Sequence, residues 1–252
     1  MPADKPLVTV IITVGPDPCY KEYVKEAVQS VLDQTYVVYD LLIIDDQANL
    51  DPYEIAMGEI TYSSSELCLD QVDRFVYTSR EFPWLSVWRT PWKIGYAQAF
   101  NCGVGLANSD LIVCLAADDK LMPEAVADCV ETYLANNQKD AWYGMSFQLE
   151  DGTTHSVLNN ICMVTKNLWR WLGGYPPSAF AGPDALLISI LMKHASDRLI
   201  EVKRGKINCW LRQHPNQDTL KQAAFFMASG VVNTIRDMET QRFVPNKEIK
   251  LR

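Results

Sequence analysis

The sequence predicts an α/β fold, in which a mixed, mostly parallel central sheet is flanked by helices. Three apolar runs, at 7–14, 39–44 and 111–116, are rich in Val, Ile and Leu and are continuous rather than alternating. Continuous runs of this kind are typical of parallel strands that are covered on both faces. Helical patterns separate the runs, and an alternation of strands and helices indicates the α/β class.

The first run, the helix after it and the second run form a predicted βαβ unit. Gly15 and Pro16 end the first strand, Asp17 can cap the next helix, and Pro18 suits its first turn. Apolar residues at i, i+3, i+4, i+7 and i+8 then give that helix one buried stripe: Val24, Ala27, Val28, Val31 and Leu32. The connection to the second strand is expected to be right-handed.

The remaining elements follow from weaker patterns. In the first half, we predict a helix over 51–60, a loop over 61–67, short strands at 75–77 and 85–89, and a helix rich in small residues over 94–107. Pro123 begins the helix that follows the third buried run. In the second half, we predict strands at 141–149, 155–164, 199–202 and 207–211, and helices at 168–172, 184–194 and 217–238.

Composition and missing motifs exclude several classes of function. The 252 residues carry 23 Lys and Arg against 31 Asp and Glu, and this net charge of −8 argues against a broad DNA-binding or anionic-membrane surface. There is no GxGxxG after the first strand, no GxxxxGK[ST] and no GxSxG, so a dinucleotide-binding Rossmann domain, a P-loop and a nucleophile elbow are disfavoured. The seven cysteines include no CxxC pair, and no apolar run approaches the ~18 residues of a membrane span. We therefore expect reduced thiols, no signal peptide, no membrane insertion and a cytoplasmic location.

Carboxylates follow two of the predicted strands at the point where each strand ends. Asp45 and Asp46 follow the second run, and Asp118 and Asp119 follow the third. In an open α/β sheet, ligands bind beyond the carboxyl ends of the strands. Two acidic pairs at one edge favour a divalent cation such as Mg²⁺ or Mn²⁺, which binds few carboxylates together with substrate phosphates. Helix capping is the alternative role for these acids.

Six segments resemble, in order and spacing, the motifs of family 2 glycosyltransferases. They are VTVII at 8–12 with SVLDQTY at 30–36, IIDD at 43–46, GYAQAFNCG at 95–103, CLAADD at 114–119, GGY at 173–175 with PD at 183–184, and RQHP at 212–215. The resemblance covers about residues 7–217 and implies a GT-A fold. It also implies one glycosyltransferase domain over 1–217, with a nucleotide-binding half at 1–120 and an acceptor-side half at 121–217, before a C-terminal helix and tail at 218–252.

The resemblance implies a metal-assisted, inverting transfer from a nucleotide-sugar donor to an acceptor hydroxyl. Asp184 would be the general base, and Mn²⁺ or Mg²⁺ would be held by Asp118, Asp119 and His214. The nucleotide would be bound by Thr13, Val14, Asp45, Asp46, Gly95, Asn101 and Asp118, with Asp45 accepting from the base and Asp46 supporting its loop. The acceptor or the diphosphate would be contacted by Trp92, Lys93, Tyr175 and Arg212.

Three positions depart from the pattern of the family. Ala116 replaces the first acid of the metal motif, Pro183 replaces the Glu of the ED pair, and Phe100 replaces an Arg. A catalytically inactive nucleotide-sugar-binding protein is therefore an alternative. A nucleotidyltransferase is a second alternative, although the loop after the first strand has no Arg or Lys before Lys21.

The sequence leaves the acceptor open. A saccharide or another hydroxyl acceptor is expected, including a lipid-linked saccharide or a protein. A modified nucleic acid is possible but not favoured, because only Lys203, Arg204 and Lys206 offer a local basic edge. Tryptophans at 84, 88 and 92 lie unusually close together. They have two interpretations, which are core packing and one wall of a ligand cleft.

Overall fold

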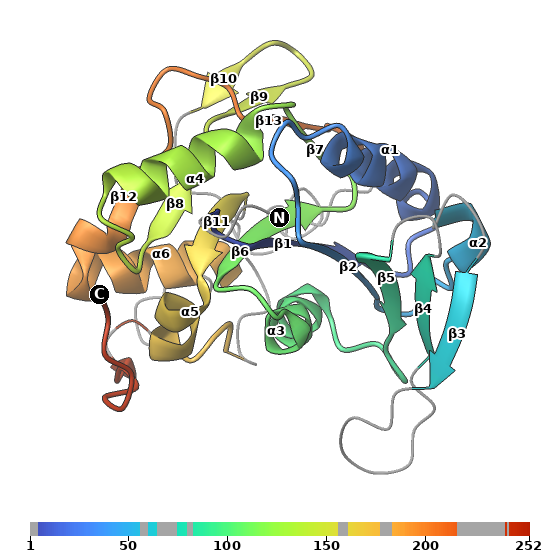
Figure 1. The fold of residues 1–252 in the computed structure, drawn as a ribbon, viewed down its shortest axis with the longest axis horizontal. Helices are drawn as coiled ribbons and strands as arrows, with labels where there is room; N and C mark the ends of the chain where they lie inside the picture. Colours follow the sequence, from blue (N-terminus) through green and yellow to red (C-terminus); the bar gives the residue numbers. More distant parts are fainter. Residues whose placement is uncertain are drawn as a thin grey trace.

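The computed structural model has a nine-stranded mixed sheet at its centre (Figure 1). It describes residues 5–55, 60–64, 75–79, 83–155, 161–176, 183–215, 240 and 242–252. Across the sheet the strands are β12 (Leu199–Glu201), β8 (Trp142–Gly144), β11 (Cys162–Thr165), β6 (Leu111–Ala116), β1 (Val8–Val14), β2 (Asp40–Asp45), β5 (Leu85–Arg89), β4 (Phe75–Ser79) and β3 (Ile60–Ser64). The central strands β6, β1, β2 and β5 are parallel, whereas β11 and β4 pair antiparallel on either side of them. The predicted α/β class is confirmed.

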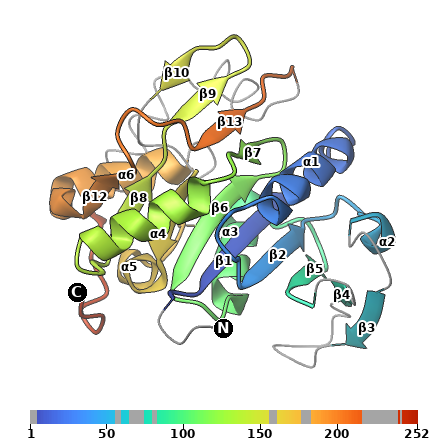
Figure 2. The same cartoon turned by 45° about the horizontal axis from the view of Figure 1, so that its top comes forward.

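Helices cover both faces of the sheet (Figures 1 and 2). One layer contains α1 (Tyr20–Leu32) and α4 (Ala125–Ala135), and the other contains α3 (Tyr96–Leu106), α5 (Lys166–Leu172) and α6 (Pro183–His194). Alternate side chains of β1 pack against opposite layers. Val10 and Ile12 lie in the core beneath α1 and α4, and Ile11 lies in the core beneath α3, α5 and α6. Two short helices complete the set: α2 (Pro52–Ile55) and the 3₁₀ turn η1 (Ser196–Arg198). Burial on both faces explains why the strand sequences are continuously apolar.

A smaller four-stranded sheet lies beyond the end of β6 (Figure 2). Its strands, in order, are β10 (Thr154–His155), β9 (Phe147–Leu149), β13 (Cys209–Leu211) and β7 (Lys120–Leu121). β7 begins directly after Asp119, and β13 pairs with it antiparallel, so that Trp210 lies opposite Lys120. This sheet therefore brings the chain after residue 211 back to the end of β6.

Several predicted element boundaries were wrong. Residues 60–64, placed in a helix and a loop, form β3, an edge strand that pairs with β4. The predicted strand over 141–149 is divided between β8 in the large sheet and β9 in the small one. The predicted strand over 155–164 overlaps β10 and β11, and residues 156–160 lie outside the described part of the chain. Most of the predicted C-terminal helix over 217–238 and of the tail also lies outside the described residues. Edge pairing, which local sequence patterns report poorly, accounts for the first two differences.

Close packing of α3 on the sheet depends on Gly103. A Cβ atom at this position would lie 2.7 Å from Cγ2 of Ile11 and 3.3 Å from Cγ1 of Ile44. We expect Gly103→Ala to lower the free energy of unfolding by about 1–3 kcal/mol, as overpacked cores do. Gly105 lies in the same helix with nothing within 4 Å of its virtual Cβ. Chemical denaturation should therefore show Gly105→Ala to be neutral or stabilising, and equal effects at both positions would contradict this explanation.

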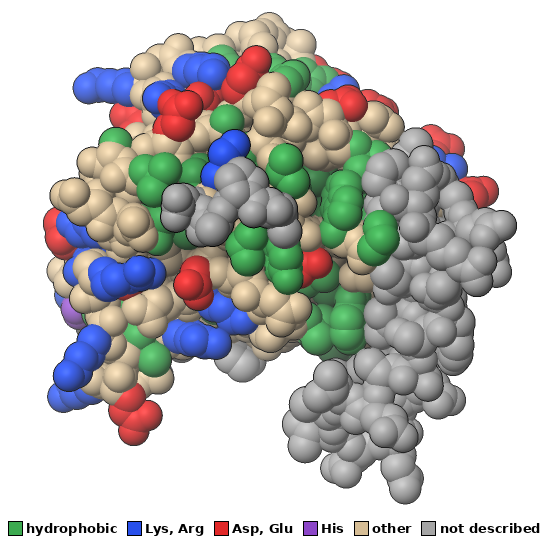
Figure 3. Space-filling view, viewed as in Figure 1, with side chains coloured by type: hydrophobic (Ala, Val, Ile, Leu, Met, Phe, Trp, Pro, Cys, Tyr) green, Lys and Arg blue, Asp and Glu red, His purple; other side chains and the backbone are tan. Residues whose placement is uncertain are grey.

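The surface mixes both signs of charge. On the face in Figure 3, acidic and basic side chains lie interspersed around hydrophobic ones, without a field of one sign. In the part of the chain that the structure describes, no helix combines the length and apolar character that a membrane span requires.

Four cysteines in the described part of the chain are buried free thiols: Cys114, Cys129, Cys162 and Cys209. Burial raises the pKa of Cys114 to about 12, so this thiol is not a nucleophile at neutral pH. The prediction of reduced, mostly buried cysteines is confirmed for these residues.

Candidate functional site

The parallel strands bring the predicted site residues to one edge of the sheet. Val14 is aligned with Asp45 across β1 and β2, and Thr13 is aligned with Ala116 across β1 and β6. The acids that end β2 and β6 therefore flank the carboxyl end of β1, which is where ligands bind in open α/β sheets. Of the β1 residues, Val14 is fully buried, and Thr13 is only slightly exposed.

Asp118 and Asp119 form the turn between β6 and β7, and both are buried. Burial is the main cause that raises the pKa of Asp119 well above its usual range, and the like charge of Asp118 adds to it. Arg212 opposes this shift, because its backbone N–H donates to Oδ1 of Asp119 over 3.1 Å. The pair thus holds negative charge that the surrounding protein only partly compensates.

His214 joins this acidic pair from the other end of the chain. Its Nε2 lies 3.0 Å from Oδ2 of Asp118, and both side chains are buried. The imidazole packs against Tyr20 and Tyr23, with ring centroids 5.9 and 5.2 Å apart. The structure therefore brings together the three residues predicted to hold the metal.

The donor set of Asp118, Asp119 and His214 fits Mn²⁺ or Mg²⁺ chemically. Carboxylate oxygens suit both ions, and imidazole suits the transition metal. A cation would also offset the like charge of Asp118, which adds to the effect of burial on the pKa of Asp119. Within the described residues, however, no group of three His, Cys, Asp or Glu side chains is arranged so that it could hold a metal ion. The metal site stays a prediction, in which substrate oxygens and water would supply further ligands.

Asp45 is bonded within the protein. Its Oδ2 accepts from Nε of Arg89 over 2.8 Å and from the N–H of Leu50 over 3.0 Å, while Oδ1 accepts from the N–H of Asn49 over 3.1 Å. Arg89 also donates to the carbonyl of Leu50. This ion pair was not predicted from the sequence, because the alignment of Asp45 with Arg89 depends on the register of β2 and β5. A bond from Asp45 to a nucleotide base, which stays a prediction, would have to compete with these partners.

Asp46 fastens the loop that leads into α3. Its Oδ1 accepts from the Thr90 hydroxyl and from the N–H of Ile94, and its Oδ2 accepts from the N–H of Gly95 over 2.7 Å. Gly95 has φ +81°, a conformation that favours glycine. Through these bonds Asp46 holds the loop between β5 and α3 in place.

Two of the residues predicted to contact the acceptor or the diphosphate lie on that loop. Trp92 is 61% exposed, and Lys93 is exposed beside it. Their exposure leaves them accessible to a ligand, and their predicted contacts remain untested.

Asn101 and Tyr175 bind each other. Nδ2 of Asn101 donates to the carbonyl of Tyr175 over 2.8 Å, and Oδ1 accepts from the N–H of Tyr175 over 2.9 Å. The Tyr175 ring is buried against Trp169 and Phe100, and burial raises its pKa well above the usual range. The structure thus places Tyr175 in the core rather than on an open surface. It gives Asn101 a structural tether, so their predicted ligand contacts would need rearrangement.

Asp184 enters the site from the start of α6. It lies in the first turn of this helix, where the helix dipole favours a negative charge. Burial nevertheless raises its pKa, against hydrogen bonds from backbone N–H groups that lower it. Asp184 and Asp119 both act electrostatically on the Cys114 thiol in β6. Cys114 and the buried residues of α6 belong to the same core, so α6 covers that face of β6.

Arg212 is held by α1. Its Nη2 lies 2.9 Å from Oε1 of Glu26, and its guanidinium carbon lies 4.2 Å from the ring centroid of Tyr23. The side chain is only 15% exposed. Glu26 and Tyr23 were not predicted from the sequence, because their spacing on an amphipathic helix does not distinguish them from ordinary surface residues.

The three closely spaced tryptophans do not form one wall. Trp84 packs with the core under α1, Trp88 packs with the opposite core, and Trp92 is exposed. The cleft-wall interpretation was therefore wrong, because Trp84 precedes β5, Trp88 lies within it and Trp92 follows it, so that the three rings lie in different surroundings.

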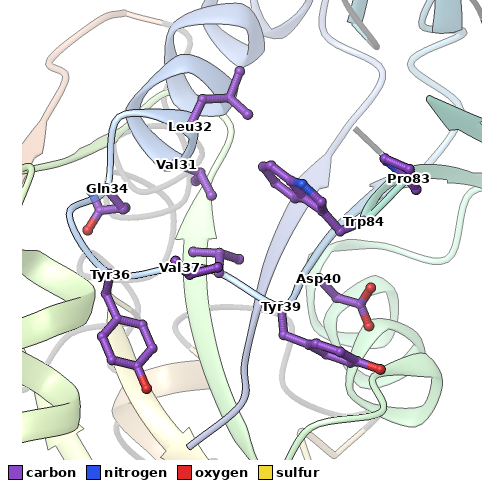
Figure 4. A pocket seen from close by; sticks show the side chains of 10 residues that line it. Val31, Leu32, Gln34, Tyr36, Val37, Tyr39, Asp40, Pro83 and Trp84 are labelled. Atoms are coloured by element: carbon purple, nitrogen blue, oxygen red, sulfur yellow. The ribbon is translucent and has the colours of Figure 1, made fainter. Parts of the chain in front are cut away.

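Trp84 lines a pocket at the other edge of the sheet. This pocket of about 550 Å³ lies at the start of β2 and β5, and Figure 4 shows the indole turned toward Val31 and Leu32. Asp40, the first residue of β2, also lines it. The pocket is thus remote from the acidic residues at the carboxyl end of the same strands.

Comparison with known proteins defines the family. The model of Glycosyl transferase family 2 matches residues 10–170, which is more than half of the chain. No curated protein matches the sequence. Among solved structures, the fold resembles S. aureus TarS 1–349, with a TM-score of 0.61 at 12% identity over 82% of this chain and 60% of that one. For TarS 1–349 in complex with UDP-GlcNAc, the TM-score is 0.64 at 11% identity over 90% and 66% of the two chains. The chain thus spans less than two thirds of these TarS chains.

The family match runs from β1 to α5 and includes the strand ends that carry both pairs of aspartates. The central sheet, its helical layers and the similarity to TarS agree with the GT-A fold. The chain belongs to glycosyl transferase family 2.

Proposed function

We propose that this protein transfers a sugar from a nucleotide-diphosphate donor, with a UDP-sugar favoured, to a hydroxyl group of an acceptor, with inversion at the sugar carbon. One observation carries the proposal: Asp118 and Asp119 are buried together at the carboxyl end of β6, and the half-buried Asp184 acts electrostatically on Cys114 of the same strand. The membership of the chain in family 2 supports the reaction class. The complexes of TarS with UDP and UDP-GlcNAc support the choice of donor.

Each carboxylate would have a separate task. Asp184 would accept the proton of the acceptor hydroxyl while the acceptor oxygen bonds to the sugar carbon and the bond from that carbon to the diphosphate breaks. A raised pKa suits this task, because a base is most effective when its pKa approaches the working pH. Asp118 and Asp119, with His214 beside them, would hold Mn²⁺ or Mg²⁺. When bound, this ion would neutralise charge on the departing diphosphate.

The acceptor is expected to be a saccharide or another molecule that carries a hydroxyl group. The exposed side chains of Trp92 and Lys93 lie on the loop that precedes α3, where a sugar ring or a phosphate could reach them. A modified nucleic acid is not favoured, because all three basic residues considered for it are paired with acids. Lys203 binds Glu131 and Lys206 binds Asp128, each over 2.7 Å, and Arg204 lies 3.8 Å from Glu201.

A thermal-shift screen tests the proposal. The protein would be heated with UDP, GDP, CDP and dTDP, each with and without Mn²⁺. We expect the largest increase in Tm with UDP and Mn²⁺ together, because a ligand at 100 times its Kd stabilises the native state by about 2.7 kcal/mol. If none of the four nucleotides changes the Tm in the presence of Mn²⁺, the proposed donor site is wrong.

A further inference from the structure

Two cations and two aromatic rings alternate beside the turn that carries Asp118 and Asp119. The guanidinium carbon of Arg212 lies 4.2 Å from the ring centroid of Tyr23 and 5.1 Å from that of Trp210. On the other side, Nζ of Lys120 lies 4.3 Å from the Trp210 centroid. All of these distances are within the range of cation–π attraction. Glu26 binds both cations, at 3.0 Å from Lys120 and 2.9 Å from Arg212.

This stack joins three segments that are far apart in the sequence. Tyr23 and Glu26 are three residues apart on α1 and therefore share one face of the helix. Lys120 belongs to β7, and Trp210 lies opposite it in β13. Burial alone would raise the pKa of Glu26, but bonds and charges from Lys120 and Arg212 outweigh burial and lower it. Glu26 therefore fastens α1 to the smaller sheet, as does Ser30, whose Oγ accepts from the N–H of Leu121 in β7.

The same stack leads directly into the proposed metal site. Besides its bond to Glu26, Arg212 donates its N–H to Oδ1 of Asp119 and its Nε–H to the carbonyl of Asp118, over 3.1 and 3.3 Å. Two residues further on, His214 contacts Asp118. Tyr23 touches both Arg212 and His214, so one side chain of α1 supports both residues that approach the acidic pair.

We propose that Glu26 and Tyr23 are positioning residues, which hold Arg212 and His214 in place over Asp118 and Asp119. The guanidinium of Arg212 then anchors the end of β13, in contrast to the contact with the diphosphate predicted from the sequence. The inference rests on the proposed function in one respect, namely that Asp118 and Asp119 bind a metal–nucleotide complex. The orientation of His214 by α1 does not depend on that function.

Glu26→Gln tests the proposal, because it removes the charge that Arg212 and Lys120 share and keeps the size of the side chain. Glu22→Gln is the matched control, since Glu22 is exposed one turn earlier on the same helix. Calorimetric titration with UDP in the presence of Mn²⁺ should show a Kd about tenfold weaker for Glu26→Gln, as for other residues that orient metal ligands. Tyr23→Leu should weaken the Kd as well, and Glu22→Gln should leave it unchanged.

The position of His214 is measured independently, without nucleotide or metal. The chain has three histidines, so replacing each in turn assigns the imidazole resonances in the NMR spectrum. In the parent protein, the ring currents of Tyr20 and Tyr23 should displace the His214 resonance, and Glu26→Gln should move it toward the value of a free imidazole.

The two readouts separate the possible failures. A Kd within twofold of the parent value and an unmoved His214 resonance in Glu26→Gln would overturn the positioning role. A parent protein that binds no nucleotide, combined with a His214 resonance that moves in Glu26→Gln, would overturn the proposed function and support the positioning of His214. A loss of Tm in Glu26→Gln without a change in Kd or resonance would show that the stack stabilises the fold and does nothing more.

Discussion

Replacement of Asp184 by Asn is expected to reduce sugar transfer by about 10²–10⁴-fold while the protein still binds UDP. The range is that of a lost general base. Asn keeps the shape of the side chain and removes only the ability to accept a proton. Because burial already disfavours the charged form of Asp184, a neutral amide at this position should not unfold the start of α6.

The measurement is the rate at which UDP is released from a UDP-sugar in the presence of candidate acceptors, together with the Kd of UDP. Asp197→Asn is a suitable control, since Asp197 is a 68% exposed side chain on the surface, paired with Lys139. Transfer at the parental rate in Asp184→Asn would show that another group is the base. If the parent itself binds UDP but transfers no sugar to any acceptor, the inactive-protein alternative raised by Ala116 and Pro183 gains support.

The pH dependence of the rate provides a second check on Asp184. A base acts only when it is deprotonated, so the rate should fall as the pH falls through the pKa of Asp184. Because burial raises this pKa, the loss should begin at a higher pH than for an ordinary aspartate. The residual rate of Asp184→Asn should show no such fall at low pH. If the fall is unchanged in this variant, it belongs to the titration of a different group.

The fold could be predicted from the sequence because its central strands are buried on both faces. β1, β2 and β6 are mostly apolar and show no alternation of polar and apolar residues, and acidic residues stand at the end of β2 and just after β6. Edge elements have no such signal. β3 depends on its pairing with β4, and the separation of β8 from β9 depends on which neighbour each strand meets in space. Local patterns carry little information on either choice.

The position of the site could also be predicted, but the partners of its side chains could not. Parallel strands bring their carboxyl ends together, so Asp45 and Asp118 had to lie at one edge. Whether a carboxylate faces a ligand or the protein depends on the neighbouring strand, and for Asp45 that neighbour supplies Arg89. Likewise, the identity of Tyr175 as a core residue depends on packing against α3 and α5. The type and order of the residues are therefore not enough to predict these contacts.

Asp119→Asn should change the stability of the protein in opposite directions with and without ligand. In the folded protein, the pKa of Asp119 is raised, mainly by burial and further by the charge of Asp118. A raised pKa means that the ionised carboxylate costs folding free energy at neutral pH, and that stability rises as the pH falls through this pKa. Asn removes the charge and keeps an oxygen that can accept from Arg212. The Tm without ligand should therefore rise, by about 2–4 °C for each kcal/mol of relieved repulsion.

With UDP and Mn²⁺ bound, the parent should have a higher Tm than Asp119→Asn. The negative charge that destabilises the protein without ligand is the charge that would attract the cation. The parent should gain Tm from the ligands, and Asp119→Asn should gain little or nothing, so that the parent becomes the more stable of the two. Asp33→Asn, on the exposed end of α1, should follow the parent in both conditions. A full ligand-induced shift in Asp119→Asn would exclude Asp119 as a metal ligand, whereas a lower Tm without ligand would show that its carboxylate is stabilising. The combination expected here would mean that the protein retains a buried, repelling carboxylate for its ligand and not for its fold.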